Sequence, residues 1–330
     1  MASAGGLSAQ FGMVDETTFG SAPTVTRFLE FNNESVQQTI ERIPSSGLRV
    51  NRRVLRSTQW TAGRKNITGD VEFEVQQQGM GLLLKHCFGT VTSAQPNAGS
   101  NPTVYEHTFK VGALDGKSFT AQIGMGDVGG TQRAFTYAGC KVSKWSLDVA
   151  IDGLLLLKPT IDGVSEATNV SLAAASYAAS AYPLAWSGGT ITMPGGATGN
   201  VKKFSLAGDN GLKLDRWFMG AAPATKKEQL EANLRPYSGS VDIEFGDLTA
   251  YNLFVNGTVG QMTAFFEGSN ISGSYNYALE LTLPAVRFDG VAPDVAGPDI
   301  IMQSMPFVAL DDGTSNAPIS AVYRTVDVTP

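Results

Sequence analysis

The sequence predicts a mainly β fold that is duplicated, with one short helix in each repeat. Charged residues make up only 16% of the 330-residue chain, well below the about 25% typical of soluble domains. Thr, Ser, Gly and Val are abundant, with 37 glycines, and this mixture favours strands and turns over long charged helices. Several segments of the first half also recur, in the same order, in the second half.

The repeat is clearest in a pair of charged strands. Residues 68–75 read TGDVEFEV and residues 238–245 read SGSVDIEF, so Gly69 aligns with Gly239 at an offset of 170 residues (239 − 69). In both segments a charged or polar residue alternates with an apolar one. This is the period of a strand that buries one face and exposes the other.

Further matches follow in the same order and divide the chain. The matched pairs are 35–43 with 203–206, 80–88 with 251–255, and 145–153 with 305–313. An ordered series of matches predicts an internal duplication. We therefore expect a first β domain over residues 1–165, a linker over 166–188 and a second β domain over 189–330. The small residues 171–181 predict a short helix or an irregular connection within the linker.

Periodicity separates the helix from the strands within each repeat. Residues 79–88 carry apolar side chains at helical spacing, which predicts a one-sided helix packed on a sheet. These side chains are Met80, Leu83, Leu84, Cys87 and Phe88. Strands are expected at 119–123, 134–142, 145–151 and 277–283. The glycine-rich residues 124–130 carry no lysine and precede no helix, so they predict a hairpin turn.

Charge and cysteine content limit the partners. The net charge is −6, and because duplex nucleic acid is held mainly by Lys and Arg that neutralise phosphates, we expect no tight DNA binding. Cys87 and Cys140 give no disulfide framework, which fits folding in a reducing cytosol. The first residues lack the basic and apolar regions of a signal peptide. No apolar run approaches the ~20 residues of a membrane span, so no membrane anchor is expected.

Several segments resemble the major tail tube proteins of long-tailed bacteriophages. In the first half these are TRFLEF at 26–31, ESV at 34–36, IERI at 40–43, the arginines that follow, and GDVE at 69–72. The second half has similar segments in FSL at 204–206, DNGL at 209–212 and SGSV at 238–241. The resemblance covers most of the chain and is strongest over residues 7–90. Its motifs are diffuse patterns and contain no active-site signature.

The resemblance implies a β-sandwich with one flanking helix, whose copies form rings that stack into a hollow tube with a continuous inner β-barrel. It implies a structural virion protein of the tail, assembled in the host bacterial cytoplasm. The implied partners are further copies of the chain and the tail terminator, tape measure and distal tail proteins. DNA would pass through the lumen during ejection without specific binding, and no cofactor is implied.

The duplication changes the ring that the resemblance implies. Most family members have one tube domain per chain and form six-membered rings, so a duplicated chain needs only three copies. We therefore expect a trimeric ring with pseudo-sixfold symmetry. Four strands from each of six domains, at ~4.8 Å spacing and ~40° tilt, give a backbone barrel roughly 45–50 Å across. Such a barrel admits duplex DNA.

Acidic residues recur on the two charged strands. Asp70, Glu72 and Glu74 point to one side of their strand, and Asp242 and Glu244 repeat the arrangement in the second half. On a single strand this pattern indicates an ordinary solvated face. Because it recurs at equivalent positions, we predict that these residues line the lumen, where like charge keeps DNA phosphates from adhering.

A basic segment precedes the first charged strand. Seven basic residues and no acidic ones lie between Arg42 and Lys65. A nucleic-acid site would need interleaved aromatic residues, and only Trp60 is present. A solvated loop is the second alternative. We favour a long hairpin loop that contacts a neighbouring subunit or the next ring. The residues assigned to this contact are Arg49, Arg52, Arg53, Arg56, Arg64 and Lys65.

Candidate catalytic and metal-binding groups are few. His86 and His107 are the only histidines, and the adjacent pair His86 and Cys87 would point about 100° apart on a helix, so it does not begin a tetrahedral metal site. No Walker loop, His-Glu-x-x-His motif or nucleophile elbow is present. We therefore predict neither a metal nor a catalytic site, and the chain is not expected to be an enzyme.

Three alternative functions remain open. The inner tube of a contractile injection machine shares the fold and is not separated by sequence. A carbohydrate-binding β-sandwich would need exposed aromatic side chains in a shallow groove, whereas the four tryptophans are scattered along the chain. A hydrolase with two catalytic carboxylates is the third alternative, but no pair of acidic residues stands out.

Overall fold

The computed structural model describes residues 5–179, 182–196, 200–220, 224–290, 292–293, 295, 297–314 and 317–330. It is mainly β, with the two eight-residue helices α1 (Gly81–Phe88) and α2 (Leu248–Val255) among the described residues. The predicted fold class is therefore confirmed. The sheets stay open, and no barrel closes within the described part of this single chain.

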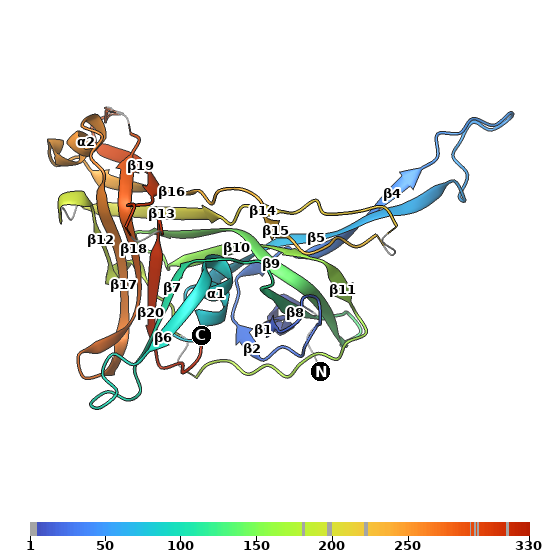
Figure 1. The fold of residues 1–330 in the computed structure, drawn as a ribbon, viewed down its shortest axis with the longest axis horizontal. Coiled ribbons are helices and arrows are strands. Elements are labelled where there is room, and N and C mark those ends of the chain that lie inside the picture. Colours follow the sequence, from blue (N-terminus) through green and yellow to red (C-terminus); the bar gives the residue numbers. More distant parts are fainter. Residues whose placement is uncertain are drawn as a thin grey trace.

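One long antiparallel sheet, called here the central sheet, passes through both halves of the chain (Figure 1). Its strands lie in the order β3 (Asn33–Glu34) with β4 (Gln37–Pro44), β5 (Trp60–Glu74), β10 (Leu156–Gly163), β9 (Gln132–Ala150), β13 (Val201–Asp209), β16 (Tyr237–Glu244), β19 (Met302–Leu310) and β18 (Tyr275–Phe288). The pairing of β9 with β13 joins the two halves.

Each half adds an outer sheet, and a long strand belongs to both layers. In the first half β2 (Arg27–Leu29), β1 (Gln10–Glu16), β8 (Ser118–Gly126), β9 and β11 (Ser165–Ala167) pair in this order. In the second half the order is β12 (Gly189–Thr192), β17 (Gly260–Ser272), β18, β20 (Ser320–Thr325), β7 (Tyr105–Val111) and β6 (Gly89–Ala94). The β6–β7 hairpin of the first half thus extends the outer sheet of the second.

The two halves share one pairing order. The series β4–β5–β10–β9 in the first half corresponds to β13–β16–β19–β18 in the second. The sequence match of 145–153 with 305–313 was wrong, because 145–150 lie in β9, whereas β19 pairs with β16 as β10 pairs with β5. The domain boundaries at 165 and 189 stay predictions.

The helix predicted at 79–88 is confirmed as α1, and the strands predicted at 119–123 and 277–283 are confirmed within β8 and β18. The strands predicted at 134–142 and 145–151 form a single strand, β9, which ends at Ala150. The predicted hairpin turn is confirmed for residues 127–131, which join β8 to β9, whereas residues 124–126 still belong to β8. Residues 171–178 have no regular structure, which supports the irregular connection over the short helix; residues 180 and 181 lie outside the described part of the chain.

The two helices differ in how far they are covered. Seven residues of α1 are buried, and the helix lies in the angle between the sheets (Figure 1). In α2 only Ala250 and Leu253 are buried. Both helices follow equivalent strands, so the difference comes from what packs against them. The core beneath the central sheet is otherwise continuous through both halves and includes Phe73, Trp145, Phe204 and Phe307.

Candidate assembly surfaces

The predicted acidic residues lie on the solvent side of β5 and β16. Asp70, Glu72 and Glu74 are partly exposed, whereas Val71 and Phe73 between them are fully buried. Asp242 and Glu244 are also partly exposed on β16 and alternate with buried residues. The alternation predicted for both strands is confirmed, while their role as a lumen lining stays a prediction.

The register of the central sheet places both acidic strands on one face. Residues directly opposite each other in neighbouring strands share a face. One such row contains Glu74, Leu156, Asp148, Ser205 and Ser240. Because Asp242 and Glu244 follow Ser240 by two and four residues, they lie on the same face as Glu74. We call this surface the polar face.

The polar face is mixed in charge. Lys144, Lys158 and Lys203 occupy positions on it between the acidic residues and are exposed. Lys144 Nζ lies 3.1 Å from Asp209 Oδ2. The sequence analysis missed these lysines, although the alternation of Lys144, Ser146 and Asp148 could have indicated them. They mean that the face carries interleaved carboxylates and ammonium groups.

Glu244, at the end of β16, has one cationic and one amide partner. Lys202 lies at a register shift in β13 and brings its Nζ atom to 3.0 Å from Glu244 Oε1. Asn200 Nδ2 donates to Glu244 Oε2 at 3.0 Å. These hydrogen bonds lower the pKa of Glu244, so the carboxylate is charged at neutral pH.

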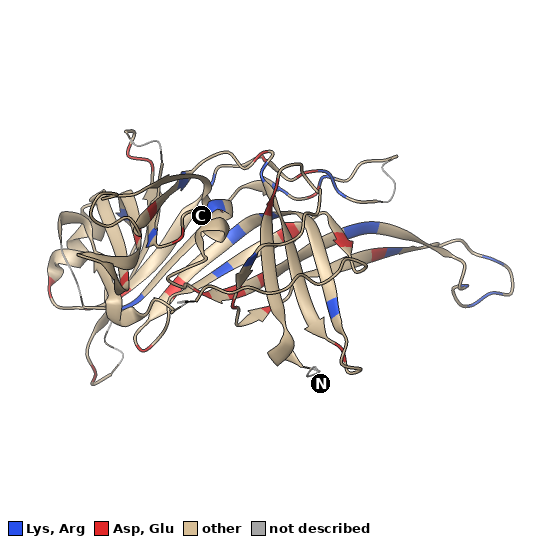
Figure 2. Ribbon diagram, turned by 90° about the horizontal axis from the view of Figure 1, so that it is seen from below, with Lys and Arg blue, Asp and Glu red and all other residues tan. Residues whose placement is uncertain are grey.

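The basic segment forms the end of a long hairpin, called here the arm, which comprises β4, the loop 45–59 and the start of β5. The arm leaves the body of the molecule (Figure 1), and Figure 2 shows basic but no acidic residues along its loop. Arg49, Arg52 and Arg53 are exposed and Arg56 is partly exposed. The loop also exposes apolar side chains, which the sequence analysis missed: Leu48, Val50, Val54 and Leu55.

Arg64 and Lys65, assigned to the same contact, lie at the base of the arm, away from the loop. Arg64 Nε donates to Glu41 Oε2 at 3.0 Å, and its guanidinium lies 5.3 Å from the ring centre of Trp217. The backbone carbonyl of Lys65 accepts from Trp217 Nε1 at 3.1 Å. The structure therefore does not bring these two residues together with the four loop arginines, and their contacts lie within the chain.

Residues 210–236, which connect β13 to β16, correspond in the second half to the loop of the arm. The described part of this segment includes β14 (Leu212–Lys213) and β15 (Leu230–Glu231) and lies along the first half (Figure 1). Lys226 Nζ donates to Asp162 Oδ2 at 2.6 Å, and both residues are buried. Burial raises the pKa of Asp162, against the effect of Lys226.

A second buried cation strengthens the attachment of the segment. Lys141 Nζ on β9 donates to Glu228 Oε1 at 2.7 Å and to the Gln229 carbonyl at 2.8 Å. Arg235 donates to the Phe88 carbonyl, which ends α1, at 3.3 Å. The segment is thus bound to the neighbouring half by buried polar contacts, whereas no described residue of the chain covers the arm loop.

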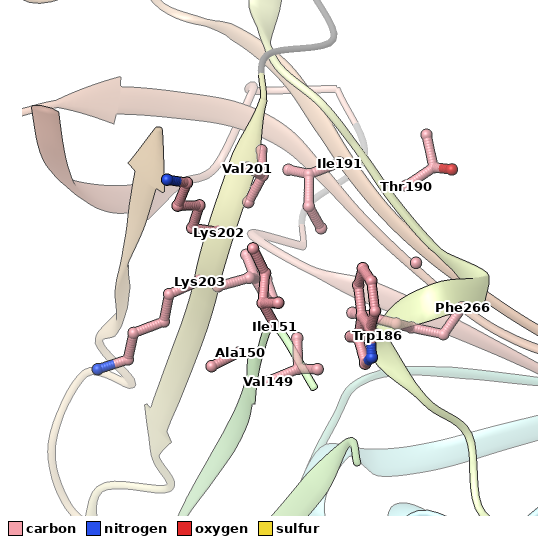
Figure 3. Close-up of a pocket in the computed structure, with 12 residues that line it drawn as sticks. Val149, Ala150, Ile151, Trp186, Thr190, Ile191, Val201, Lys202, Lys203 and Phe266 are labelled. Atoms are coloured by element: carbon pink, nitrogen blue, oxygen red, sulfur yellow. The ribbon is translucent and has the colours of Figure 1, made fainter. Parts of the chain in front are cut away.

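A small apolar cavity of about 170 Å³ lies at the seam between the halves (Figure 3). Val149 of β9, Ile151 just after it, Trp186 and Phe266 line it, while Lys202 and Lys203 extend away from these side chains. Trp186 is half-exposed here, whereas Trp60 lies on the arm, Trp145 is buried and Trp217 contacts Arg64. The four tryptophans therefore do not form a shared binding platform.

The histidines have structural surroundings. His86 is buried beneath Phe119, and its Nε2 lies 2.7 Å from Asp15 Oδ1. Burial lowers the pKa of His86, although Asp15 opposes this effect. His107 contacts Ser93 Oγ and the Asp327 carbonyl. Within the described part of the chain no three His, Cys, Asp or Glu residues lie close enough to hold a metal.

Both cysteines are buried, free thiols, and burial raises the pKa of each. They are therefore poor nucleophiles, because the thiolate is the reactive form. None of the helices in the described ranges is long and apolar enough to cross a membrane.

The comparisons with known proteins agree with the fold. A search of curated proteins finds no match to the chain. A family model described as phage tail tube protein matches residues 6–309, which covers both halves, the central sheet and the arm. The chain therefore belongs to the phage tail tube protein family.

Proposed function

We propose that copies of this chain join head to tail into rings that stack into the tail tube, the conduit through which DNA leaves the virion. The observation that carries the proposal is the central sheet, which passes through both halves and ends in an open edge on each side. In the described residues β3 and β4 pair with β5 only, and residues 302–305 pair with β16 only, whereas the Pro306 carbonyl also accepts from Asp289 N–H. A head-to-tail contact between unlike edges covers both.

The ring that we favour contains three copies. Its support is the shared pairing order of the two halves, since β4, the counterpart of β13, is an open edge that can meet the second half of the next copy as β13 meets the first half of its own chain. Three chains then supply six similar units around the axis. End-on electron micrographs of assembled protein test this directly. Threefold modulation of a six-unit ring is expected, and six whole chains per ring would contradict the proposal.

The polar face is proposed to line the lumen. Its support is that the face is solvent-exposed, rich in carboxylates, and shared by all strands from β5 to β16. Because lysines alternate with the acids, we expect a wall that presents paired charges to DNA and gives the phosphates no continuous basic track. Replacing Glu72 and Asp242 with lysine should slow DNA ejection while tubes still form. Unchanged ejection kinetics would contradict the lumen assignment, and Asp311→Lys at an exposed turn is the matched control.

The arm is proposed to contact a neighbouring copy. Its loop exposes four apolar side chains beside four arginines, and its counterpart 210–236 is already bound to the adjacent half. Replacing residues 46–58 with a short glycine–serine linker keeps β4 and β5 but removes the loop. We expect soluble subunits that do not polymerise, measured by sedimentation and electron microscopy. Tubes that form at the normal protein concentration would refute this role.

The proposed role is structural and not catalytic. The family is one of tail tube proteins, and the polar groups described above are explained by ion pairs, hydrogen bonds and turns. The chain would act in the virion tail, with further copies of itself as the principal partner.

A further inference from the structure

The first half contains a filled slot between the end of β5 and the start of β10. Val75 N–H donates to the Leu155 carbonyl at 2.8 Å, and a third segment then joins both residues. Leu184 N–H donates to the Val75 carbonyl at 2.8 Å, and Leu155 N–H donates to the Leu184 carbonyl at 2.9 Å. Leu184 is buried. One residue of an extended segment therefore bridges the two strands.

The second half contains the same slot without a bridging segment. Phe245 N–H donates to the Ile301 carbonyl at 2.9 Å, which reproduces the pair formed by Val75 and Leu155. Phe245 follows Val75 by the repeat offset of 170 residues. Within the described ranges, no backbone hydrogen bond joins the Phe245 carbonyl or the Ile301 N–H to a third segment. The slot therefore presents one free acceptor and one free donor.

A buried polar side chain points to a missing partner at this slot. Gln303 is 1% exposed, and neither its Oε1 nor its Nε2 atom has a hydrogen-bond partner. It lines a cavity of about 280 Å³ together with Phe245, Asp247 and Ala250. The register places Gln303 opposite Ile243 as Leu157 lies opposite Phe73. A buried amide without a partner is unfavourable, so the position favours a ligand with both a donor and an acceptor.

The occupant of the first slot identifies the occupant of the second. Leu184 lies just before the 3₁₀ helix η2 (Trp186–Gly188), which leads into β12. The counterpart of β12 is β1, since β12 pairs with β17 as β1 pairs with β8. A 3₁₀ helix, η1 (Gly6–Ser8), also precedes β1. The corresponding segment is therefore the one that precedes η1.

We propose that the segment before η1 of one copy inserts into the open slot in the second half of the next copy, so that Phe245 and Ile301 bind its backbone and the Gln303 amide binds one of its peptide groups. This inference rests on the proposed head-to-tail assembly. It requires a second copy, because β1 lies near the middle of the molecule, well away from α2, whose start adjoins the slot (Figure 1). Residues 2–6 read ASAGG, and none of these side chains is larger than that of serine.

Disulfide cross-linking between two singly labelled populations tests the insertion. One population carries Ser3→Cys and the other carries Thr249→Cys, an exposed position that lines the slot cavity. The native thiols are buried and stay silent. After the two are mixed, assembled and oxidised, we expect a covalent dimer on a non-reducing gel. Thr258→Cys, exposed beyond the other end of α2, is the matched control and should give little dimer.

The outcomes separate this inference from the proposed function. Tubes that form without the Thr249 cross-link, or with equal cross-linking at Thr258, overturn the inference alone. Failure of the unmodified chain to form rings or tubes overturns both. Gln303→Leu adds a second measurement, because the counterpart of Gln303 beside the filled slot is Leu157. We expect folding to be retained and the protein concentration needed for assembly to rise roughly five- to tenfold. An unchanged concentration, as expected if only water meets Gln303, would contradict the proposal.

Discussion

The buried ion pair between Asp162 and Lys226 should be the most sensitive polar contact in the chain. The two side chains are 2% and 0% exposed, and Lys226 also donates to Asn66 Oδ1 at 3.0 Å. Asp162→Asn removes the negative charge and leaves the ammonium group buried without a counter-charge. Breaking a buried pair in this way costs about 3–5 kcal/mol. We expect a loss of that size in the free energy of unfolding, measured by urea denaturation.

The matched control is an ion pair at the surface. Lys144 and Asp209 are 65% and 35% exposed, so Asp209→Asn should cost about 0–1 kcal/mol. A double variant, Asp162→Leu with Lys226→Met, should recover much of the loss, because an apolar pair of similar volume removes both buried charges. If Asp162→Asn costs no more than Asp209→Asn, the pair is not desolvated as described, and the attachment of residues 210–236 must have another origin.

Two further predictions concern a glycine and a histidine. A Cβ atom on Gly239 would lie 2.0 Å from the Ser205 carbonyl oxygen, so Gly239→Ala should lower the free energy of unfolding by about 1–3 kcal/mol. A Cβ atom on Gly246 would meet open space, so Gly246→Ala should be near neutral in the same urea assay. Equal effects of the two substitutions would refute the close approach. Burial lowers the pKa of His86 below its ordinary 6.5. Below about pH 6.5 this histidine is therefore protonated more fully in the unfolded chain than in the folded one, so the thermal stability should fall as the pH drops through this range. Burial alone would raise the pKa of Asp15, but hydrogen bonds from His86 and Lys85 hold it at about 2, against an ordinary 3.8, so its contribution should persist until the pH falls below about 4. A His86→Gln variant with an unchanged profile between pH 7 and 5 would contradict the histidine assignment.

Short-range patterns predicted the local elements of this fold because each depends on neighbouring residues. The alternation from Asp70 to Val75 follows from one buried face, and the helix at 79–88 follows from its apolar spacing. Pairing between distant strands is not encoded in such patterns. The contact of β9 with β13 depends on residues about 60 positions apart in the chain. The alternation of Lys144 with Asp148 could have shown that these two residues share a face, but only the register places the lysines of the polar face between the two acidic strands.

The match of 145–153 with 305–313 failed for a related physical reason. Buried strands share an apolar alternation, so strands with different places in a sheet can look alike in sequence. Gly69 and Gly239 were better guides, because each is fixed by a close backbone approach. A Cβ on Gly69 would lie 2.4 Å from the Ser35 carbonyl, and the one on Gly239 would meet Ser205 in the same way. The offset between these glycines is therefore set by packing and not by composition.

The differences between the two halves indicate where a neighbour belongs. A chain with two similar units contains one unit–unit interface within itself, and head-to-tail assembly repeats that interface between chains. At the internal interface residues 210–236 place Arg235 on the end of α1, which is buried. At the interface between chains, Leu248 and Val255 of α2 are exposed. The loop of the arm, which is the counterpart of residues 210–236, is not covered by any described residue of its own chain. We therefore expect the apolar and basic loop of the arm to cover α2 of the adjacent copy, since two surfaces left open by the same missing contact must meet when it forms.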